Sequence, residues 1–339
     1  MTAAPRPDPI APPADAQPSV SAQGMAIAVI APCYNEEVSV GDVVAAFRKA
    51  LPAARIYVYD NNSTDRTVEI ARQAGAQVRS EARQGKGNVV RRMFADIDAD
   101  IYVMVDGDNT YHADSAPILI DRLIEDDLDM VIGTRLHSTE ADAFRSGHRF
   151  GNAVLTGSVN RLFGAQLVDI LSGYRVMSRR FVKSFPALSS GFETETELTI
   201  HALELRTPIA EIETPYAVRP EGSVSKLNTW GDGFRILRTI LKLVREFRPV
   251  LFYGGSAAVL CLLALSLAWP VFATYLDTGL VPRLPTAILA TGVMLLAFLS
   301  ATAGLILENV SRGRWEQKRM AYLSLPSVRS ARARADRDR

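Results

Sequence analysis

The stretch IYVMVDGDNTY, residues 101–111, joins an apolar run directly to a group of polar residues. Its first five residues are apolar and rich in β-branched and aromatic side chains, which is typical of a buried strand. The DGD triplet that follows places two carboxylates, Asp106 and Asp108, one small residue apart. Ligands of parallel sheets bind beyond the carboxyl ends of the strands. We therefore predict that this stretch is a strand of an α/β fold that leads into a ligand site.

The same arrangement occurs twice upstream. Residues 27–31 (IAVIA) and 56–59 (IYVY) are predicted strands, followed by the polar clusters PCYNEE at 32–37 and DNNSTD at 60–65. A fourth strand is expected at 130–132, with helices over 39–50 and from about Ser63, capped by Ser63 or Thr64. Each cluster alone fits ordinary turn chemistry. Three at one edge of a mainly parallel sheet indicate a binding site.

The DGD triplet favours a hard divalent cation, because carboxylate oxygens suit Mg²⁺ or Mn²⁺. Thr110 and Tyr111 exclude an EF-hand, since that loop needs Asp or Asn and then Gly there. The GKG segment at 85–87 is not a P-loop, because no Ser or Thr follows Lys86. Lys86 is nevertheless a candidate cation for a phosphate group.

Two long stretches near the C-terminus, 249–276 and 284–307, contain no charged residue. Roughly 20 apolar residues suffice for a helix to cross a bilayer core, so we predict two transmembrane helices. Segment 233–248 alternates apolar and basic stripes and is a predicted interfacial helix, with a helix packed on the soluble domain as the alternative. Basic residues lie outside both stretches, which predicts a cytoplasmic catalytic domain and cytoplasmic termini. These flanking residues are Arg235, Arg238, Lys242, Arg245, Arg248, Arg312, Arg314, Lys318 and Arg319.

The domain prediction follows from these patterns. A Pro/Ala-rich segment over 1–24 lacks a signal-peptide core and is expected to be disordered, and 25–230 forms the catalytic domain. An interfacial helix at 231–248, a transmembrane hairpin at 249–308 and a solvated basic tail at 309–339 complete the chain. Its 38 Lys and Arg balance 37 Asp and Glu, so no nucleic-acid partner is predicted. Cys33 and Cys261 lack zinc-site spacing and are expected to be buried thiols.

Seven motifs in order resemble glycosyltransferase family 2, within it the polyprenyl-phosphate glycosyltransferases. They are APCYNEE, YDNNSTDRT, RQGKGNVVR, VDGDNTY, VIGTR, DILSGYRVMSRR and RPEGSVSK. The resemblance implies a GT-A fold, which is Rossmann-like with a mainly parallel sheet. It also implies a nucleotide-sugar donor, UDP- or GDP-linked, and a polyprenyl phosphate acceptor. Glycines in the apolar stretches, among them Gly254 and Gly292, permit close packing in a homo-oligomer.

The resemblance assigns roles to individual residues. Pro32, Tyr34, Asn35, Glu36 and Asp60 correspond to donor nucleotide contacts. Asp106 would face ribose and diphosphate and, with Asp108, hold the metal. The residues that correspond to contacts of the acceptor phosphate and the donor diphosphate are Arg135, Arg175, Ser178, Arg219, Ser225 and Lys226.

The implied reaction is an inverting single displacement, with Asp106, Asp108, Arg135 and Arg175 as the candidate catalytic residues. Thr110 stands where mannose synthases carry Gln, which leaves the third metal ligand and the sugar open. Two alternatives remain. A processive polysaccharide synthase is disfavoured because its Q-x-x-R-W motif is absent from the sequence. A non-enzymatic membrane-anchored sensor of nucleotide sugars would keep the same pocket.

Overall fold

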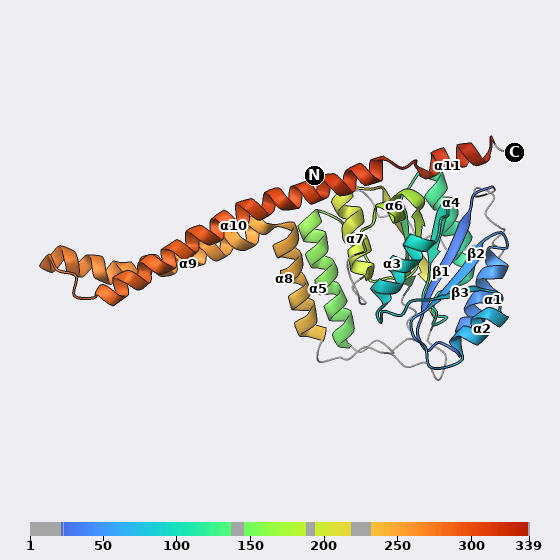
Figure 1. Ribbon diagram of the computed structural model, residues 1–339, viewed down its shortest axis with the longest axis horizontal. Coiled ribbons are helices and arrows are strands. Elements are labelled where there is room, and N and C mark those ends of the chain that lie inside the picture. The colour runs from blue at the N-terminus through green and yellow to red at the C-terminus, as the bar shows by residue number, and fades with distance from the viewer. Residues whose placement is uncertain (1–21, 23, 137–145, 188–193, 218–231, 338–339) are drawn as a thin grey trace. The chain divides into compact units, whose positions relative to one another are not determined.

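The computed structural model describes residues 22, 24–136, 146–187, 194–217 and 232–337 (Figure 1). The chain divides into two compact units, one of residues 1–229 with 318–339 and one of residues 230–317. The predicted disordered segment 1–24 lies almost wholly outside the described residues.

A seven-stranded sheet forms the centre of the first unit. Its strands are β1 (Ile27–Cys33), β2 (Arg55–Asp60), β3 (Gln77–Ser80), β4 (Ile101–Met104), β5 (Met130–Leu136), β6 (Arg175–Ser178) and β7 (Ile209–Pro215). They lie in the order β3-β2-β1-β4-β6-β5-β7. Only β6 runs against its neighbours, pairing antiparallel with both β4 and β5, so the prediction of a mainly parallel sheet is confirmed. All four predicted strands are present.

Helices cover both faces of this sheet. The helices of the first unit are α1 (Val40–Ala50), α2 (Thr67–Gln73), α3 (Lys86–Asp96), η1 (Ala113–Ser115), α4 (Ala116–Glu125), α5 (Ser146–Phe163), α6 (Arg179–Ser184), α7 (Thr194–Leu205) and α11 (Val328–Ala335). Successive residues of β1 point to opposite faces, so Val29 packs in the core with Val44 of α1, and Ile30 packs with Val90 of α3. Figure 1 shows α1 and α2 on one side of the sheet and α3, α6 and α7 on the other.

Helix α2 begins later than predicted. The sequence placed its start near Ser63, but the first helical residue is Thr67. Asp65 precedes the helix, where its carboxylate accepts hydrogen bonds from the Thr67 hydroxyl at 2.5 Å and the Thr67 N–H at 3.0 Å. Ser63 instead accepts from the Asn35 N–H at 2.9 Å, so the predicted capping residues bind another loop.

The C-terminal segment folds against the first unit, whereas a solvated tail was expected. The Tyr322 hydroxyl donates to the fully buried carboxylate of Asp129 at 2.5 Å. Arg180 donates to the same carboxylate at 2.8 Å and stacks on the Tyr322 ring at 4.4 Å. Val328 is 2% exposed and belongs to the core. Burial of the apolar surface of Val328 and Tyr322 stabilises this packing, and a tail of charged residues alone would lack that stabilisation.

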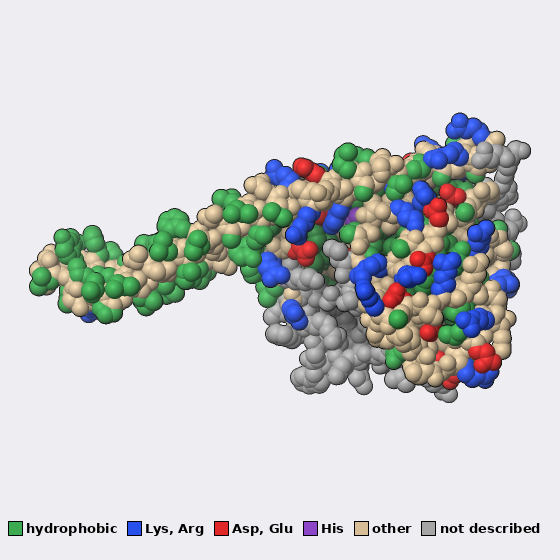
Figure 2. Space-filling view, in the orientation of Figure 1, with side chains coloured by type: hydrophobic (Ala, Val, Ile, Leu, Met, Phe, Trp, Pro, Cys, Tyr) green, Lys and Arg blue, Asp and Glu red, His purple; other side chains and the backbone are tan. Residues whose placement is uncertain are grey.

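The second unit consists of helical segments. They are α8 (Asp232–Phe247), α9 (Pro249–Thr278) and α10 (Leu284–Leu323), the last of which continues into the first unit. Helices α9 and α10 are long and apolar enough to cross a membrane. Figure 2 shows hydrophobic side chains over their visible surface. Cys33 is buried as expected, but Cys261 of α9 is half-exposed because this helix has few covering neighbours.

His201 of α7 is a buried histidine whose ring lies against Phe181 and Phe185. Its Nε2 lies 3.1 Å from the Ser184 hydroxyl, and its Nδ1 has no hydrogen-bond partner among the described residues. Burial, together with the charge of Lys318, lowers the pKa of His201 to about 3. The unfolded chain takes up this proton near pH 6.5 and the folded chain does not. The stability that depends on neutral His201 is therefore complete above pH 6.5 and decreases as the pH falls.

We expect His201→Leu to flatten the pH dependence of stability. Between pH 6.5 and 5.0 the wild-type chain should lose about 2 kcal/mol through this residue, since one pH unit corresponds to about 1.4 kcal/mol. The measurement is thermal unfolding of the full chain in detergent at both pH values. His112→Leu is the control, because His112 is exposed. Equal acid sensitivity of wild type and His201→Leu would contradict the prediction.

Candidate active site

The DGD turn after β4 is held rigidly from three directions. Asp108 is 4% exposed and accepts a hydrogen bond from the Thr110 hydroxyl at 2.7 Å. The Ser39 hydroxyl at the start of α1 donates to the Gly107 carbonyl at 2.7 Å. A side chain at position 107 would lie 2.5 Å from the Cys33 sulfur, so glycine is required there. The two carboxylates are therefore presented by a fixed turn.

The turn before β6 lies directly opposite Asp106. A Cβ atom on Gly173 would lie 2.4 Å from Asp106 Oδ2. The Gly173 N–H donates to the Tyr111 hydroxyl at 2.9 Å, which ties the two turns together. Burial raises the pKa of Tyr111, so this phenol stays neutral. Asp106 thus occupies a narrow slot that only glycine leaves open.

Lys86, the first residue of α3, reaches the same turn. Its ammonium nitrogen lies 2.5 Å from Asp106 Oδ1 and also contacts Glu195 Oε1 of α7. Burial alone would lower the pKa of Lys86, but the two carboxylates raise it above its usual value. A permanent positive charge therefore lies beside Asp106.

Asparagines brace the loops around these groups. The Asn61 amide nitrogen donates to the carbonyls of Glu81 and Arg83 at 2.9 and 2.8 Å, and its oxygen accepts from the Gly85 N–H at 2.7 Å. Asn35, which has a left-handed φ of 52°, accepts from the Thr64 N–H at 2.8 Å. The same edge holds four more of these residues. Pro32 lies near the end of β1 and Asp60 ends β2, while Tyr34 and Glu36 follow β1. The structure thus brings the predicted donor contacts to one edge.

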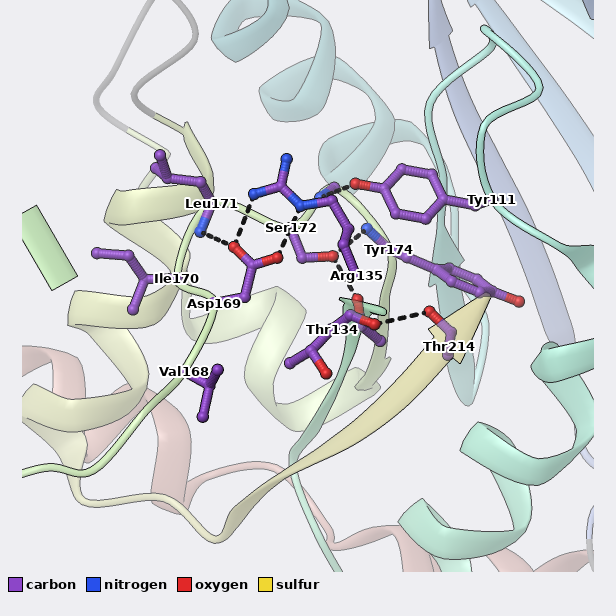
Figure 3. Close-up of polar contacts among 12 residues, drawn as sticks. Tyr111, Thr134, Arg135, Val168, Asp169, Ile170, Leu171, Ser172, Tyr174 and Thr214 are labelled. Carbon is purple, nitrogen blue, oxygen red and sulfur yellow. Dashed lines mark hydrogen bonds and ion pairs between the residues drawn. The ribbon is translucent and has the colours of Figure 1, made fainter. Parts of the chain in front are cut away.

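Arg135 near the end of β5 forms a second polar centre (Figure 3). Its Nε and Nη2 donate to the two oxygens of Asp169 at 2.7 and 2.8 Å. Burial would raise the pKa of Asp169, but Arg135 and two backbone N–H groups hold it below its usual value. The guanidinium also lies 5.8 Å from the ring of Tyr216, which packs on Tyr111 beside the DGD turn. The pair fixes a planar cation at the carboxyl edge of the sheet.

Two predicted phosphate contacts lie elsewhere. Arg175 is fully buried, and its guanidinium donates to the carbonyls of Ile170 and Ser172 at 2.7 and 2.9 Å. Burial lowers its pKa to about 10. Ser178 pairs with Ile101 at the opposite edge of the sheet, where it caps α6. Arg175 therefore supports the 170–172 turn, and the structure does not bring Ser178 to the other site residues.

The remaining predicted contacts, Arg219, Ser225 and Lys226, lie outside the described residues. The described segment that precedes them ends at Ala217, close to the DGD turn, where the Ala217 N–H donates to the Thr110 carbonyl at 2.9 Å.

The residues of the DGD turn fit a divalent cation with an incomplete protein ligand set. The described residues contain no group of three or more His, Cys, Asp or Glu side chains placed to hold a metal. Asp106 already faces a cation, the Lys86 ammonium, which shows that this position suits positive charge. The two carboxylates would hold a cation whose other ligands come from phosphate oxygens or water.

Three residues of this site were missed from the sequence. Glu195 has no role in the sequence prediction, and Asn61 and Asp169 occur there only within the YDNNSTDRT and DILSGYRVMSRR motifs. The acidic start of α7 and the DILSGYR motif mark Glu195 and Asp169 in the sequence, but neither pattern indicates which residue forms the ion pair. Their partners, Lys86, Arg135 and the 81–85 loop, lie 20 or more residues away.

We expect Gly173→Ala to displace Asp106, because the added methyl group would overlap Oδ2. The affinity for Mn²⁺ should fall at least tenfold, measured by titration of the full chain in detergent. Gly157→Ala is the matched control, since nothing lies within 4 Å of the added atom. That change lies inside α5 and should leave the affinity unchanged while adding up to about 1 kcal/mol of stability. Unchanged Mn²⁺ affinity in Gly173→Ala would contradict the assigned role of Asp106.

Comparison with known proteins adds an independent line of evidence. Residues 28–185 match the family described as Glycosyl transferase family 2. The chain is 32% identical over 278 residues to Glycosyltransferase AglJ of Haloferax volcanii, a match covering 80% of this chain and 91% of that protein. It is 31% identical over 222 residues to the dolichyl-phosphate hexose transferase of the same organism, covering 66% and 95%.

The fold has a counterpart among solved structures. Glucosyl-3-phosphoglycerate synthase from Mycobacterium tuberculosis, crystallised with Mn²⁺, UDP-glucose and phosphoglyceric acid, matches with a TM-score of 0.54. The match has 21% identity and covers 68% of this chain and 82% of that one, which shows a shared GT-A fold. With the seven-stranded sheet and its carboxylate turn, these findings establish that the chain is a glycosyltransferase that belongs to glycosyl transferase family 2.

Proposed function

We propose that this protein transfers a sugar from a nucleotide-sugar donor to a polyprenyl phosphate in a metal-dependent, inverting reaction. The observation that carries the proposal is the gathering of two carboxylates and two cations at one sheet edge, in a chain with two helices long enough to span a bilayer. The dolichyl-phosphate hexose transferase of Haloferax volcanii, by its name, uses a lipid phosphate.

The donor binds along the edge formed by the ends of β1, β2 and β4. The nucleoside of its UDP or GDP group contacts Pro32, Tyr34, Asn35, Glu36 and Asp60, and Lys86 lies where the diphosphate would follow. Asp106 and Asp108 would hold Mg²⁺ or Mn²⁺, which would neutralise charge on the leaving diphosphate. The UDP-glucose and Mn²⁺ in the structure of the M. tuberculosis synthase support this donor class.

The acceptor phosphate binds to Arg135. The two hydrogen bonds to Asp169 hold its guanidinium in one plane, and guanidinium groups suit phosphate oxygens. The RPEGSVSK motif assigns Arg219, Ser225 and Lys226, which lie outside the described residues, to the same phosphate. Arg175 contributes to the acceptor site indirectly, because it binds the carbonyl of Ile170 in the turn that directly follows Asp169.

The transfer requires no protein base. A phosphate monoester with a second pKa of about 6 is largely ionised at neutral pH. One of its oxygens forms a bond to the anomeric carbon, the bond from that carbon to the diphosphate breaks, and the nucleoside diphosphate leaves with the electron pair. The protein mainly brings two anions together, so its Arg and Lys side chains, together with a divalent ion, would supply most of the stabilisation.

We further propose that α9 and α10 span the membrane and that α8 lies in its cytoplasmic interface. The catalytic unit and both termini are then cytoplasmic, as the flanking basic residues predict. An acceptor with its tail in the bilayer would present its phosphate beside Lys226 of the RPEGSVSK motif, which precedes α8 in the sequence.

The proposed reaction is tested by a transfer assay. Purified full-length protein in detergent is mixed with a polyprenyl phosphate and labelled UDP- or GDP-sugars, with and without Mg²⁺ or Mn²⁺. We expect one donor to label the lipid only when metal is present, and Asp108→Ala to reduce the rate at least 100-fold. Asp98→Ala is the control, because this exposed carboxylate pairs with Arg179 at the opposite edge. Polymer as the product would indicate a processive synthase, and donor binding without any product a sensor.

The acceptor site is tested by Arg135→Lys. Lysine keeps the charge but loses the two-bond pairing with Asp169, so the KM for polyprenyl phosphate should rise at least tenfold while the KM for the donor changes less. Arg179→Lys is the matched control, since its exposed partner Asp98 lies away from the site. A rise confined to the donor KM would place Arg135 on the diphosphate and overturn this assignment.

A further inference from the structure

The contact between Lys86 and the DGD turn carries an inference about how the site takes up its ligands. The Lys86 side chain is 11% exposed and the Glu195 side chain 7%. Both of its carboxylate partners come from separate elements, the turn after β4 and the start of α7. The ammonium is therefore enclosed between two anions and does not extend into solvent.

The ammonium is also held at this place by the main chain. Lys86 follows Gly85, whose N–H donates to the buried Asn61 at 2.7 Å. Gly85 has a φ of 124°, a conformation that favours glycine, and α3 starts directly after it. The first residue of α3 is thus fixed, and the side chain alone has freedom to move.

One oxygen of Asp106 is occupied by this ammonium while the other lies against Gly173. A divalent cation that binds Asp106 would meet a positive charge on the same carboxylate. Two cations repel at such short range, which favours departure of the ammonium from Asp106 when the metal binds. Glu195 is the second anion that can keep hold of it.

We propose that Lys86 is an exchangeable internal counter-ion of the DGD turn and that Glu195 is the positioning residue for the exchange. Without ligands, the ammonium neutralises Asp106. When the divalent cation and the nucleoside diphosphate bind, the ammonium leaves Asp106, stays paired with Glu195 and donates to the diphosphate. This inference rests on the proposed function for the identity of the ligands, but it concerns binding and not transfer.

The proposal predicts effects of opposite sign for one variant. In Lys86→Met, Mn²⁺ alone should bind at least threefold more tightly, because no ammonium competes for Asp106. UDP and GDP are both tested in the presence of saturating Mn²⁺. The nucleotide that the wild type binds should bind at least tenfold more weakly to the same variant. Free Mn²⁺ is measured by electron paramagnetic resonance and nucleotide binding by calorimetry, with the full chain in detergent. Arg83→Met is the control, an exposed cation of the same loop.

Glu195→Gln tests the positioning role. Without Glu195 the ammonium has only Asp106, so Mn²⁺ alone should bind at least threefold more weakly than in Glu197→Gln, which removes the same charge from the same helix. Lys86→Met leaves the buried Glu195 carboxylate without its ammonium partner. If that variant does not fold, the double variant Lys86→Met/Glu195→Gln is measured in its place. The double variant should bind Mn²⁺ alone more tightly than Glu195→Gln.

Three results would overturn the exchange. They are weaker or unchanged binding of Mn²⁺ alone in Lys86→Met, unchanged nucleotide binding in that variant, and equal effects of Glu195→Gln and Glu197→Gln. None of these measurements needs an acceptor or a product. Transfer to lipid phosphate without the opposite-sign effects would reject the exchange alone, and the effects without transfer would reject the proposed reaction alone.

Discussion

The site depends on the close approach of Asp106 to Gly173. Strands β4 and β6 are antiparallel, with Met104 opposite Arg175, and the same register continued beyond both strands places residue 106 opposite residue 173. A side chain at 173 would overlap the Asp106 carboxylate at 2.4 Å. One reversed strand therefore brings the SGY turn to the carboxyl edge of an otherwise parallel sheet, where it encloses the DGD turn. Arg175 secures this arrangement from inside by bonding the carbonyls of the turn before β6.

Beyond the strand ends, side chains take over the role of the β-ladder. Ser39 binds the carbonyl of the DGD turn, Asn61 satisfies three backbone groups of the 81–85 loop, and Asn35 joins the loop after β1 to the loop after β2. Buried or crowded backbone groups need such partners. The polar clusters at the strand ends therefore serve both as turns and as a binding site, since they close the loops and also present the site groups.

The fold was predictable from sequence where burial leaves a local pattern. The strands at 27–33 and 101–104 and the apolar helices carry long uncharged runs, and all are present. Strand β6 was not predicted, because four residues including a buried arginine give no such run and its direction is set by its neighbours. Arg175 and Ser178 share one motif yet lie at opposite ends of β6, so a motif alone could not place both at the site.

The pairing of charges is the part that only the folded chain determines. Asp106, Asp108 and Lys86 are recognisable from their motifs, but Glu195 is 109 residues from Lys86 and its role depends on where α7 begins. Its presence changes the electrostatics, because the single Lys86 ammonium faces two carboxylates and neutralises the charge of only one. A diphosphate is repelled by the remaining carboxylate charge unless a cation binds with it. The same pairs that hold the turn together thus make the uptake of anion and cation interdependent.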